Sequence, residues 1–191
     1  DKTYDGGTSA TLDTSSVLYS GLVSGDTFNG SYTGAFSNAN VGSGKTVNIT
    51  SSYSGADVNN YTVTDQSSTT ADISAKALTA TASASNKTYN ASNSASVTLT
   101  LSGLVGSETL VSTNTSTFNN KNVGTGKTVT VNSITLADGT NGGLAANYSI
   151  SAGQTTTANI TAKSLTVSGI TASNKAYDGN SVASLDVSSV A

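Results

Sequence analysis

Hydrophobic residues alternate with small polar residues along much of this chain, which is the pattern of strands that bury one face. The clearest run is Val97, Leu99 and Leu101, with threonine between them. Shorter runs with the same period of two lie at residues 47–49, 61–63, 129–131 and 148–150. A helix-spaced apolar stripe never extends beyond two turns. We therefore expect an all-β chain with no substantial helix.

Turn signals separate these runs. Glycine stands beside aspartate, asparagine or serine at residues 5–7, 24–26, 41–44, 138–139 and 141–143. Such clusters mark tight turns between strands. Roughly seven short strands in roughly 85 residues predict a small two-layer, β-sandwich-like module.

The sequence repeats itself in ordered blocks, which is the signature of a tandem array. The matched blocks are residues 1–5 with 86–90 and 174–178, 21–28 with 103–110, 40–50 with 122–132, 60–64 with 147–151, and 70–79 with 157–166. We expect modules arranged end to end, at residues 1–79 and 80–166, followed by the start of a third at 167–191. The first module lacks the leading strand that residues 76–82 should give the second.

Apolar positions shared between the repeats define the predicted core. Its principal members are Phe36, Phe118, Tyr61, Tyr148, Val47 and Val129. Further shared positions are Leu12 with Val97 and Leu185, Leu22 with Leu104, Phe28 with Leu110, Val41 with Val123, Val63 with Ile150, Ile73 with Ile160, and Leu78 with Leu165. The junction at residues 74–88 contains neither glycine nor proline. It reads as strand rather than flexible linker, and it predicts a semi-rigid string of modules.

The composition restricts the chemistry. Cysteine, histidine, methionine, tryptophan and proline are absent, and the eight basic residues are all lysine. Thiolate or imidazole metal sites, histidine-dependent catalysis and disulfides are therefore excluded. A net charge of −3 argues against nucleic acid as a partner. Serine and threonine make up 65 of 191 residues, and we expect no enzyme and no cofactor.

Targeting features are missing as well. No stretch approaches the roughly 18 apolar residues of a membrane span, so we expect no membrane insertion. The first residue is Asp1, and no basic-then-apolar leader follows it. We expect the chain to be a segment of something longer, with its targeting signal elsewhere.

The repeated blocks resemble a known family. They read Lys-Thr-Tyr-Asp-Gly, Leu-Val-Ser-Gly-Asp, Asn-Val-Gly-X-Gly-Lys-Thr-Val, Asn-Tyr and Ile-X-Ala-Lys-X-Leu-Thr. They are similar to the YDG and mostly-bacterial-glycine-rich (MBG) repeats of large secreted bacterial adhesins, including filamentous-haemagglutinin-like exoproteins. The resemblance implies an all-β stalk repeat outside the cell or on the bacterial cell surface, and it carries no catalytic residue.

The family signature itself is expected to be a structural turn. It stands at Tyr4, Asp5 and Gly6 and again at Tyr177, Asp178 and Gly179, whereas Tyr89 is followed by Asn90 and Ala91. Aspartate accepts hydrogen bonds from following amides, and glycine supplies a positive φ. A ligand contact is the alternative, weakened by the Asn90-Ala91 variant.

Calcium is a candidate metal, because bound calcium often takes carboxylate oxygens in extracellular modules. Asp26 and Glu108 are the matched pair that keeps a carboxylate in both modules, so they are the weak calcium candidates. No calcium-loop motif accompanies them, and solvated turn acids are the alternative.

Two further motifs have plain structural readings. Residues 42–46 and 124–128 read Gly-X-Gly-Lys-Thr, but a β pattern follows, which indicates a tight turn rather than a phosphate loop. Seven lysines recur at matching positions. Protection of exposed sheet edges explains them, and a lysine–asparagine isopeptide cross-link is the alternative.

The sequence favours a structural repeat that gives a bacterial adhesin or biofilm-matrix protein length and reach, with neighbouring repeats as partners. One alternative is a self-assembling filament whose copies join head to tail by strand exchange, through a surplus strand after about Leu165. The other is a glycan- or host-protein-binding module that uses Tyr19, Tyr32 and Tyr53.

Overall fold

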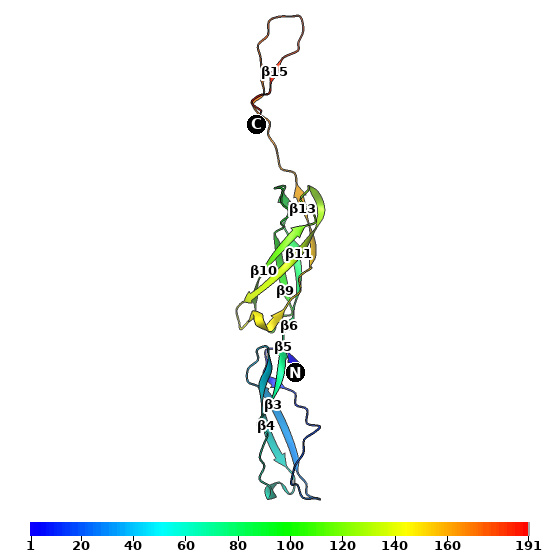
Figure 1. Cartoon of the computed structure of the whole chain (residues 1–191), viewed down its shortest axis with the longest axis vertical. Helices are drawn as coiled ribbons and strands as arrows, with labels where there is room; N and C mark the ends of the chain where they lie inside the picture. The colour runs from blue at the N-terminus through cyan, green and yellow to red at the C-terminus, as the bar shows by residue number, and fades with distance from the viewer. Residues whose placement is uncertain (191) are drawn as a thin grey trace.

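The computed structural model describes residues 1–190 and is a slender rod (Figure 1). We divide it by strand pairing into a first unit (residues 1–74), a second unit (residues 76–161) and a tail (residues 162–190). The two units stand end to end, and the N-terminus lies beside their junction. Helix is limited to the 3₁₀ turns η1 (Val58–Asn60) and η2 (Ala145–Asn147) among the described residues, so the all-β prediction is confirmed.

The first unit is built on one five-stranded sheet. Its strands are β1 (Lys2–Thr3), β2 (Ser9–Ala10), β3 (Asn29–Phe36), β4 (Gly42–Ser54) and β5 (Ser68–Ser74), in the order β1-β5-β4-β3-β2. β3 and β4 form a long antiparallel hairpin whose register places Phe36 opposite Val47. β1 pairs with β5 in parallel. Residues 11–28 connect β2 to β3 without a strand.

The second unit repeats this plan and adds a second sheet. β10 (Leu110–Phe118), β11 (Gly124–Asp138), β13 (Thr155–Thr161) and β8 (Lys87–Thr88) form its main sheet. β7 (Thr79–Ala84) pairs with β9 (Val97–Ser102) as a separate antiparallel pair. β6 (Lys76–Ala77) pairs in parallel with β12 (Tyr148–Ser149). The second unit therefore has two layers, as the sandwich-like prediction requires.

The tail continues beyond the second unit as an extended, irregular segment that ends in a loop (Figure 1). Its two short strands, β14 (Thr171–Ala172) and β15 (Leu185–Asp186), pair with each other. Its side chains are exposed, and Leu165 is 90% exposed. Leu165 and Leu185 were expected in a core, but the described tail packs no second layer over them.

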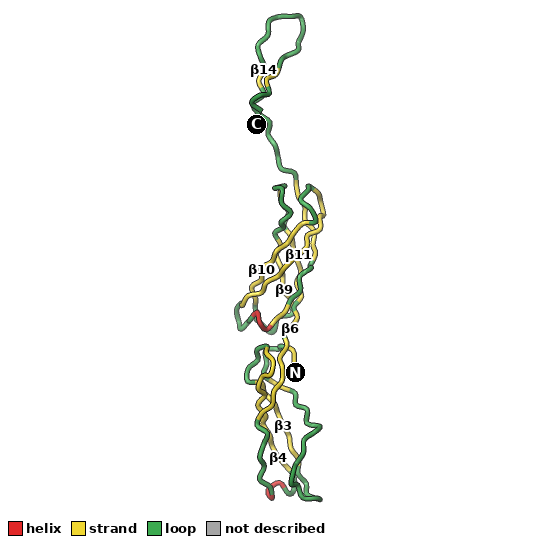
Figure 2. Tube along the Cα trace, in the orientation of Figure 1, coloured by secondary structure: helices red, strands yellow, loops and turns green. Residues whose placement is uncertain are grey.

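The core lies on the inner faces of the two main sheets. Phe36, Val47, Phe118, Val129 and Tyr148 are buried. The predicted core residue Tyr61 is only half-buried, and the run that begins there is an irregular loop instead of a strand. The physical reason is that Tyr148 has the first unit stacked against it. Tyr61 instead follows the turn η1, which lies at the free end of the rod (Figure 2).

Two more predicted core positions are exposed for the same reason. Val63 is exposed at the free end of the first unit, whereas its counterpart Ile150 packs at the junction. Val123 is exposed at the far end of the second unit, whereas its counterpart Val41 packs at the junction. Burial at these positions is supplied by a neighbouring unit rather than by the unit itself.

Candidate functional site: the joint between the units

The units meet at a joint whose hydrophobic residues are continuous with the core of the first unit. Tyr4, Ile73, Leu78 and Tyr148 belong to one buried cluster, with Val105 packed against it. The cluster takes residues from both units and from the chain between them. Figure 2 shows the red turn η2 at the end of the second unit that faces the first. A continuous apolar cluster of this kind resists bending, because any opening exposes its surface to water.

A carboxylate at the centre of the joint links two tyrosines. Tyr4 Oη donates a hydrogen bond of 2.7 Å to Glu108 Oε1, and Tyr148 Oη donates one of 2.7 Å to Glu108 Oε2. The Tyr148 hydroxyl also accepts a 2.9 Å bond from the Val105 amide. The two rings pack edge to face, with centroids 5.3 Å apart. Bonds to an ionised carboxylate are stronger than neutral ones, so this trio specifies how the units align.

The buried phenols are held in the protonated form. Burial, followed by the hydrogen bond to the Glu108 carboxylate, raises the pKa of Tyr4 to about 12. The same two causes raise the pKa of Tyr148. Losing either proton would place a second negative charge beside Glu108 in a partly buried site. The joint is therefore an assembly of donors around one acceptor.

An asparagine forms the second polar contact of the joint. Asn147, at the end of η2, is buried and reaches into the first unit. Its Oδ1 accepts a 2.9 Å bond from the Val41 amide, and its Nδ2 donates a 3.1 Å bond to Asn40 Oδ1. A buried amide costs free energy if either its oxygen or its nitrogen is left unpaired, and here both are paired. Asn147 thus fixes the rotation of one unit against the other.

The chain itself forms the third contact. β6 follows β5 after a single residue and pairs with β12 in the second unit. The Leu78 amide then donates a 2.8 Å bond to the Ser149 carbonyl, and the Leu78 side chain is buried in the joint. The strand expected across residues 74–88 is present as β6, β7 and β8 with short breaks between them.

The family signature positions Tyr4 for this role. The Asp5 side chain accepts a 2.8 Å bond from the Gly7 amide and pairs with Lys2 Nζ at 2.6 Å. These contacts lower the pKa of the Asp5 carboxyl, and Lys2 contributes most. Lys2 also donates to the Gly7 carbonyl. The turn is thus locked from within, and Tyr4 leaves it pointing at the second unit.

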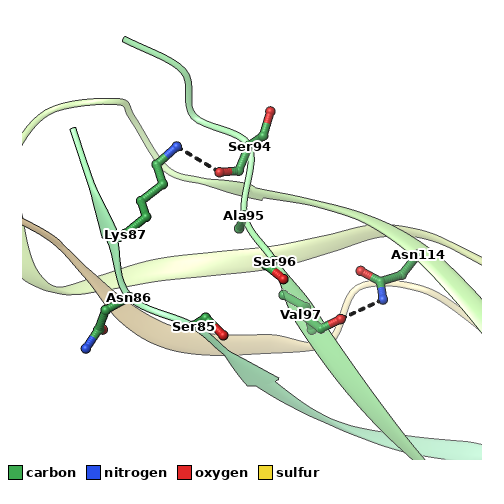
Figure 3. A pocket seen from close by; sticks show the side chains of 8 residues that line it. All are labelled: Ser85, Asn86, Lys87, Ser94, Ala95, Ser96, Val97 and Asn114. Carbon is green, nitrogen blue, oxygen red and sulfur yellow. Dashed lines mark hydrogen bonds between the residues drawn. The ribbon is translucent and has the colours of Figure 1, made fainter. Parts of the chain in front are cut away.

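The same lock recurs in both later copies of the signature. In the second unit Lys87 Nζ donates to Asn90 Oδ1 and to the carbonyls of Ser92 and Ser94. Figure 3 shows Lys87 extended toward Ser94 along a shallow polar groove. In the tail Lys175 pairs with Asp178 at 2.7 Å. Lys2, Lys87 and Lys175, each two residues before the signature tyrosine, therefore lock turns, which is a different role from sheet-edge protection.

Positive φ at the third signature position is common to all three turns. Gly6 has φ +79° and Gly179 φ +77°, and Ala91 adopts φ +65° although it is not glycine. The turn geometry therefore does not depend on the Asp-Gly pair, and Asn90-Ala91 reproduces it with some backbone strain. A Cβ at Gly6 would stand 2.9 Å from Val105 Cγ1, because this turn touches the second unit.

The free end of the first unit carries the receiving half of the same joint. Tyr61 Oη donates a 2.6 Å bond to Asp26 Oδ2 and accepts a 3.0 Å bond from the Val23 amide. These are the counterparts of Tyr148, Glu108 and Val105. The turn η1 lies at this end of the first unit, as η2 lies at the end of the second unit that faces the first (Figure 2). The hydrogen bond to Asp26 raises the pKa of Tyr61.

The carboxylates that sequence reasoning assigned weakly to calcium therefore bind phenols. Within residues 1–190 no group of three or more acidic, histidine or cysteine side chains is placed to hold a metal ion. The recurrence of an acid at Asp26 and Glu108 had a structural cause that the metal hypothesis missed. The sequence did contain a sign of this cause. Each unit has both the acid (Asp26 or Glu108) and an Asn-Tyr pair (residues 60–61 or 147–148).

The remaining signature tyrosines have different surroundings. Tyr89 is half-buried at the far end of the second unit, and Tyr177 in the tail is 99% exposed. Only Tyr4 meets another unit within the described residues. The sequence placed all three in turns but did not distinguish a docked tyrosine from a free one.

Among residues 1–190, none of the helical segments has the length and hydrophobicity of a membrane span.

Comparison with known proteins agrees with the repeated blocks. No curated protein and no solved structure gives a significant match to the chain. The sequence model of the YDG domain matches twice, at residues 1–71 and 74–158. These two matches fall on the two units that the joint connects, and together they cover most of the chain, which therefore belongs to the YDG domain family.

Proposed function

We propose that these YDG units are structural repeats of an extracellular bacterial adhesin or biofilm-matrix protein, where they give length and reach. The observation that carries this proposal is the joint, which aligns two units through the Glu108 trio, Asn147 and a paired backbone strand. A spacer needs such a joint, since freely hinged units would collapse into a coil. The cellular setting comes from the resemblance to adhesin repeats.

The joint combines features that favour alignment over tight burial. Its polar contacts have fixed directions, since hydrogen bonds to Glu108 and Asn147 cross between the units. Neighbouring units of one chain do not need a large interface, because the covalent link keeps them at high effective concentration. A modest joint then suffices to hold the rod straight.

The test is the shape distribution of the chain in solution. Small-angle scattering of the intact chain should give one rod-like particle with a narrow range of maximum dimensions. Glu108→Gln should broaden that range, because a carboxylate that accepts from two phenols becomes a neutral amide. Asp26→Asn is the matched control, since it alters the equivalent trio at the free end. An intact chain that already bends freely would contradict the proposal.

The location needs a separate measurement. Antibodies raised against the folded chain should label intact cells of the producing bacterium. Labelling that requires permeabilised cells would contradict an extracellular role without affecting the rod itself.

Glycan binding is the weaker candidate function. Tyr19, Tyr53 and Tyr61 gather around Phe28 with ring centroids 5.0 to 5.7 Å from it. Tyr32 joins them through its hydroxyl, 3.0 Å from that of Tyr19. These rings pack mainly on one another, so little flat aromatic surface is left to stack on a sugar.

A further inference from the structure

We propose that the groove of the first unit binds residues 163–170 of a second copy, as the second unit holds its own β6 and β7. The proposal rests on the stalk function and names its partner, which is another YDG unit joined head to tail. Four observations carry it: the groove, its filled counterpart, the donor segment and the duplicated tyrosine trio.

The groove runs along the first unit between residues 11–22 and the inner face of the main sheet. Its volume is about 1120 Å³. Polar residues make up about half of its lining. The apolar and aromatic side chains among the rest include several that are not fully buried: Leu12, Leu22, Phe28, Ile49, Tyr61 and Ala71. A groove of mixed polar and apolar lining beside a sheet can take an extended chain segment, whose backbone and alternate side chains use both kinds of surface.

The second unit shows what fills the equivalent place. There β7 lies against β13 and pairs with β9, which places Ala80 opposite Leu101 and Ala84 opposite Val97. The underlying Val131 is 0% exposed and Ala158 is 5% exposed. Their counterparts in the first unit, Ile49 and Ala71, are half-buried. The covering strand accounts for this difference.

The tail carries a segment of matching sequence. Lys163-Ser164-Leu165 repeats Lys76-Ala77-Leu78, which enters the joint as β6. Leu78 is 6% exposed, whereas Leu165 is 90% exposed and Val167 is 65% exposed. Residues 163–170 form no strand. The side chains at Leu165 and Val167 point to one face when extended, which is what the groove requires.

The two ends of the chain also carry the two halves of the tyrosine joint. Asp26 and Tyr61, with the Val23 amide, form the receiving half. Tyr89, at the far end of the second unit, is the counterpart of the docked Tyr4. Docking would place the Tyr89 hydroxyl on the Asp26 carboxylate, as Tyr4 sits on Glu108.

The asparagine contact is duplicated in the same way. Asn60 is exposed at the receiving end and matches the buried Asn147. Its expected partners in the next copy are Asn122 and Val123, which match Asn40 and Val41. Val123 is 54% exposed. Each side-chain contact of the internal joint therefore has a counterpart whose two halves lie at opposite ends of the chain, and none of these counterpart side chains is fully buried.

A contact of this kind between copies does not close into a ring. The two surfaces differ, and they lie at opposite ends of a rod, so the contact is heterologous and produces a linear chain rather than a closed dimer. Two separate copies have no covalent link between them, so the contact must form by diffusion. Association is therefore expected to be weak and to rise with concentration.

The first experiment measures association of the intact chain by sedimentation equilibrium. Leu165→Asp together with Val167→Asp should weaken self-association at least tenfold, because both side chains enter the groove. Val182→Asp with Val187→Asp is the matched control, since these exposed tail residues lie outside the donor segment. It should change association less than twofold. Equal effects of both pairs, or an intact chain that stays monomeric at millimolar concentration, would overturn the proposal.

The second experiment tests the register. In the internal joint Ala77 pairs with Ser149, so Ser164 of one copy should pair with Thr62 of the next. The chain contains no cysteine, and each single variant, Ser164→Cys or Thr62→Cys, therefore carries one thiol. Mixing the two under mild oxidation should give the mixed disulfide dimer in excess over either homodimer. A statistical mixture, or polysaccharide binding in the groove of a monomeric chain, would overturn strand pairing.

These outcomes separate the two proposals. A straight monomeric rod that never associates would refute the strand contact and leave the stalk function intact. A chain that bends freely at the internal joint would refute the stalk function whatever its association.

Discussion

The two units share one sheet plan but differ in what covers it. The second unit has β7 and β9 as a second layer, together with the first unit stacked on one end. The first unit has a groove in place of that layer, and its equivalent end is free. Matched residues such as Tyr148 and Tyr61 are accordingly buried in one unit and half-buried in the other. A YDG unit thus completes its core with chain from its neighbourhood.

The largest expected effect concerns the covered core. Phe118 is 2% exposed beneath the second layer, and Phe118→Ala should cost about 3–5 kcal/mol of unfolding free energy through lost burial and a cavity. Phe36→Ala, its counterpart beside the groove, should cost less because the site is open to relaxation. Chemical denaturation of both variants measures this. Equal costs would mean that the second layer adds nothing to Phe118.

The next effect separates the docked trio from the free one. Glu108→Gln weakens two hydrogen bonds to a charged acceptor and should cost about 2–3 kcal/mol. Asp26→Asn alters one such bond at the free end and should cost about 1 kcal/mol or less. Thermal unfolding of both variants gives the comparison. A larger loss for Asp26→Asn would contradict the joint as described.

Alkaline pH should loosen the joint. The pKa of Tyr4 is raised from 10.0 to about 12 in the folded chain. Its contribution to stability is complete below pH 10 and is lost as the pH rises through about 12, because the folded state resists losing the proton. Scattering across this window should show the rod beginning to bend. Tyr4→Phe is the control, since its remaining alkaline response must come from other tyrosines.

A smaller effect tests the strained turn. Ala91→Gly removes the strain of a left-handed alanine but adds freedom to the unfolded chain, so it should stabilise by roughly 0.5–1 kcal/mol. Gly6→Ala should do the opposite, and more strongly, because the new Cβ would stand 2.9 Å from Val105 Cγ1. Melting temperatures of the two variants provide the measurement. Destabilisation by Ala91→Gly would show that the alanine has a packing role.

The smallest expected effect is that of metal removal. The oxygens of Glu108 already accept bonds from two phenols, so a chelator should leave the melting temperature and the rod shape unchanged. A drop of several degrees, restored by calcium, would return the carboxylates of Asp26 and Glu108 to a metal role.

Local pattern predicted much of the fold because strands record burial every second residue. The run through Val97, Leu99 and Leu101 became β9, and the runs around Val47 and Val129 became parts of β4 and β11. Tyr61 failed because its burial depends on a neighbouring unit, and a single repeat carries no record of whether that neighbour is present. The alternation of apolar and polar residues predicts which face of a strand is buried, but it does not predict whether the end of a unit is covered by a neighbour.

The joint was harder to predict because its residues are far apart in the sequence. Tyr4 and Glu108 are separated by 104 positions, and nothing local connects a turn tyrosine to a recurring acid. Matching the repeats did find each member: Asp26 with Glu108, and Tyr61 with Tyr148. Matching the repeats could not predict how the two units are placed relative to each other. That placement brings Tyr4 of the first unit against Glu108 of the second.

The near-continuous path from β5 through β6 to β7 determines how the rod would carry load. One residue separates β5 from β6, and one separates β6 from β7. There is therefore almost no slack between the units, and tension applied along the rod would pass through the backbone rather than through the Glu108 trio. The side chains would resist bending while the peptide chain bears the pull. Such a tether would lengthen under force by unfolding a unit rather than by opening a joint.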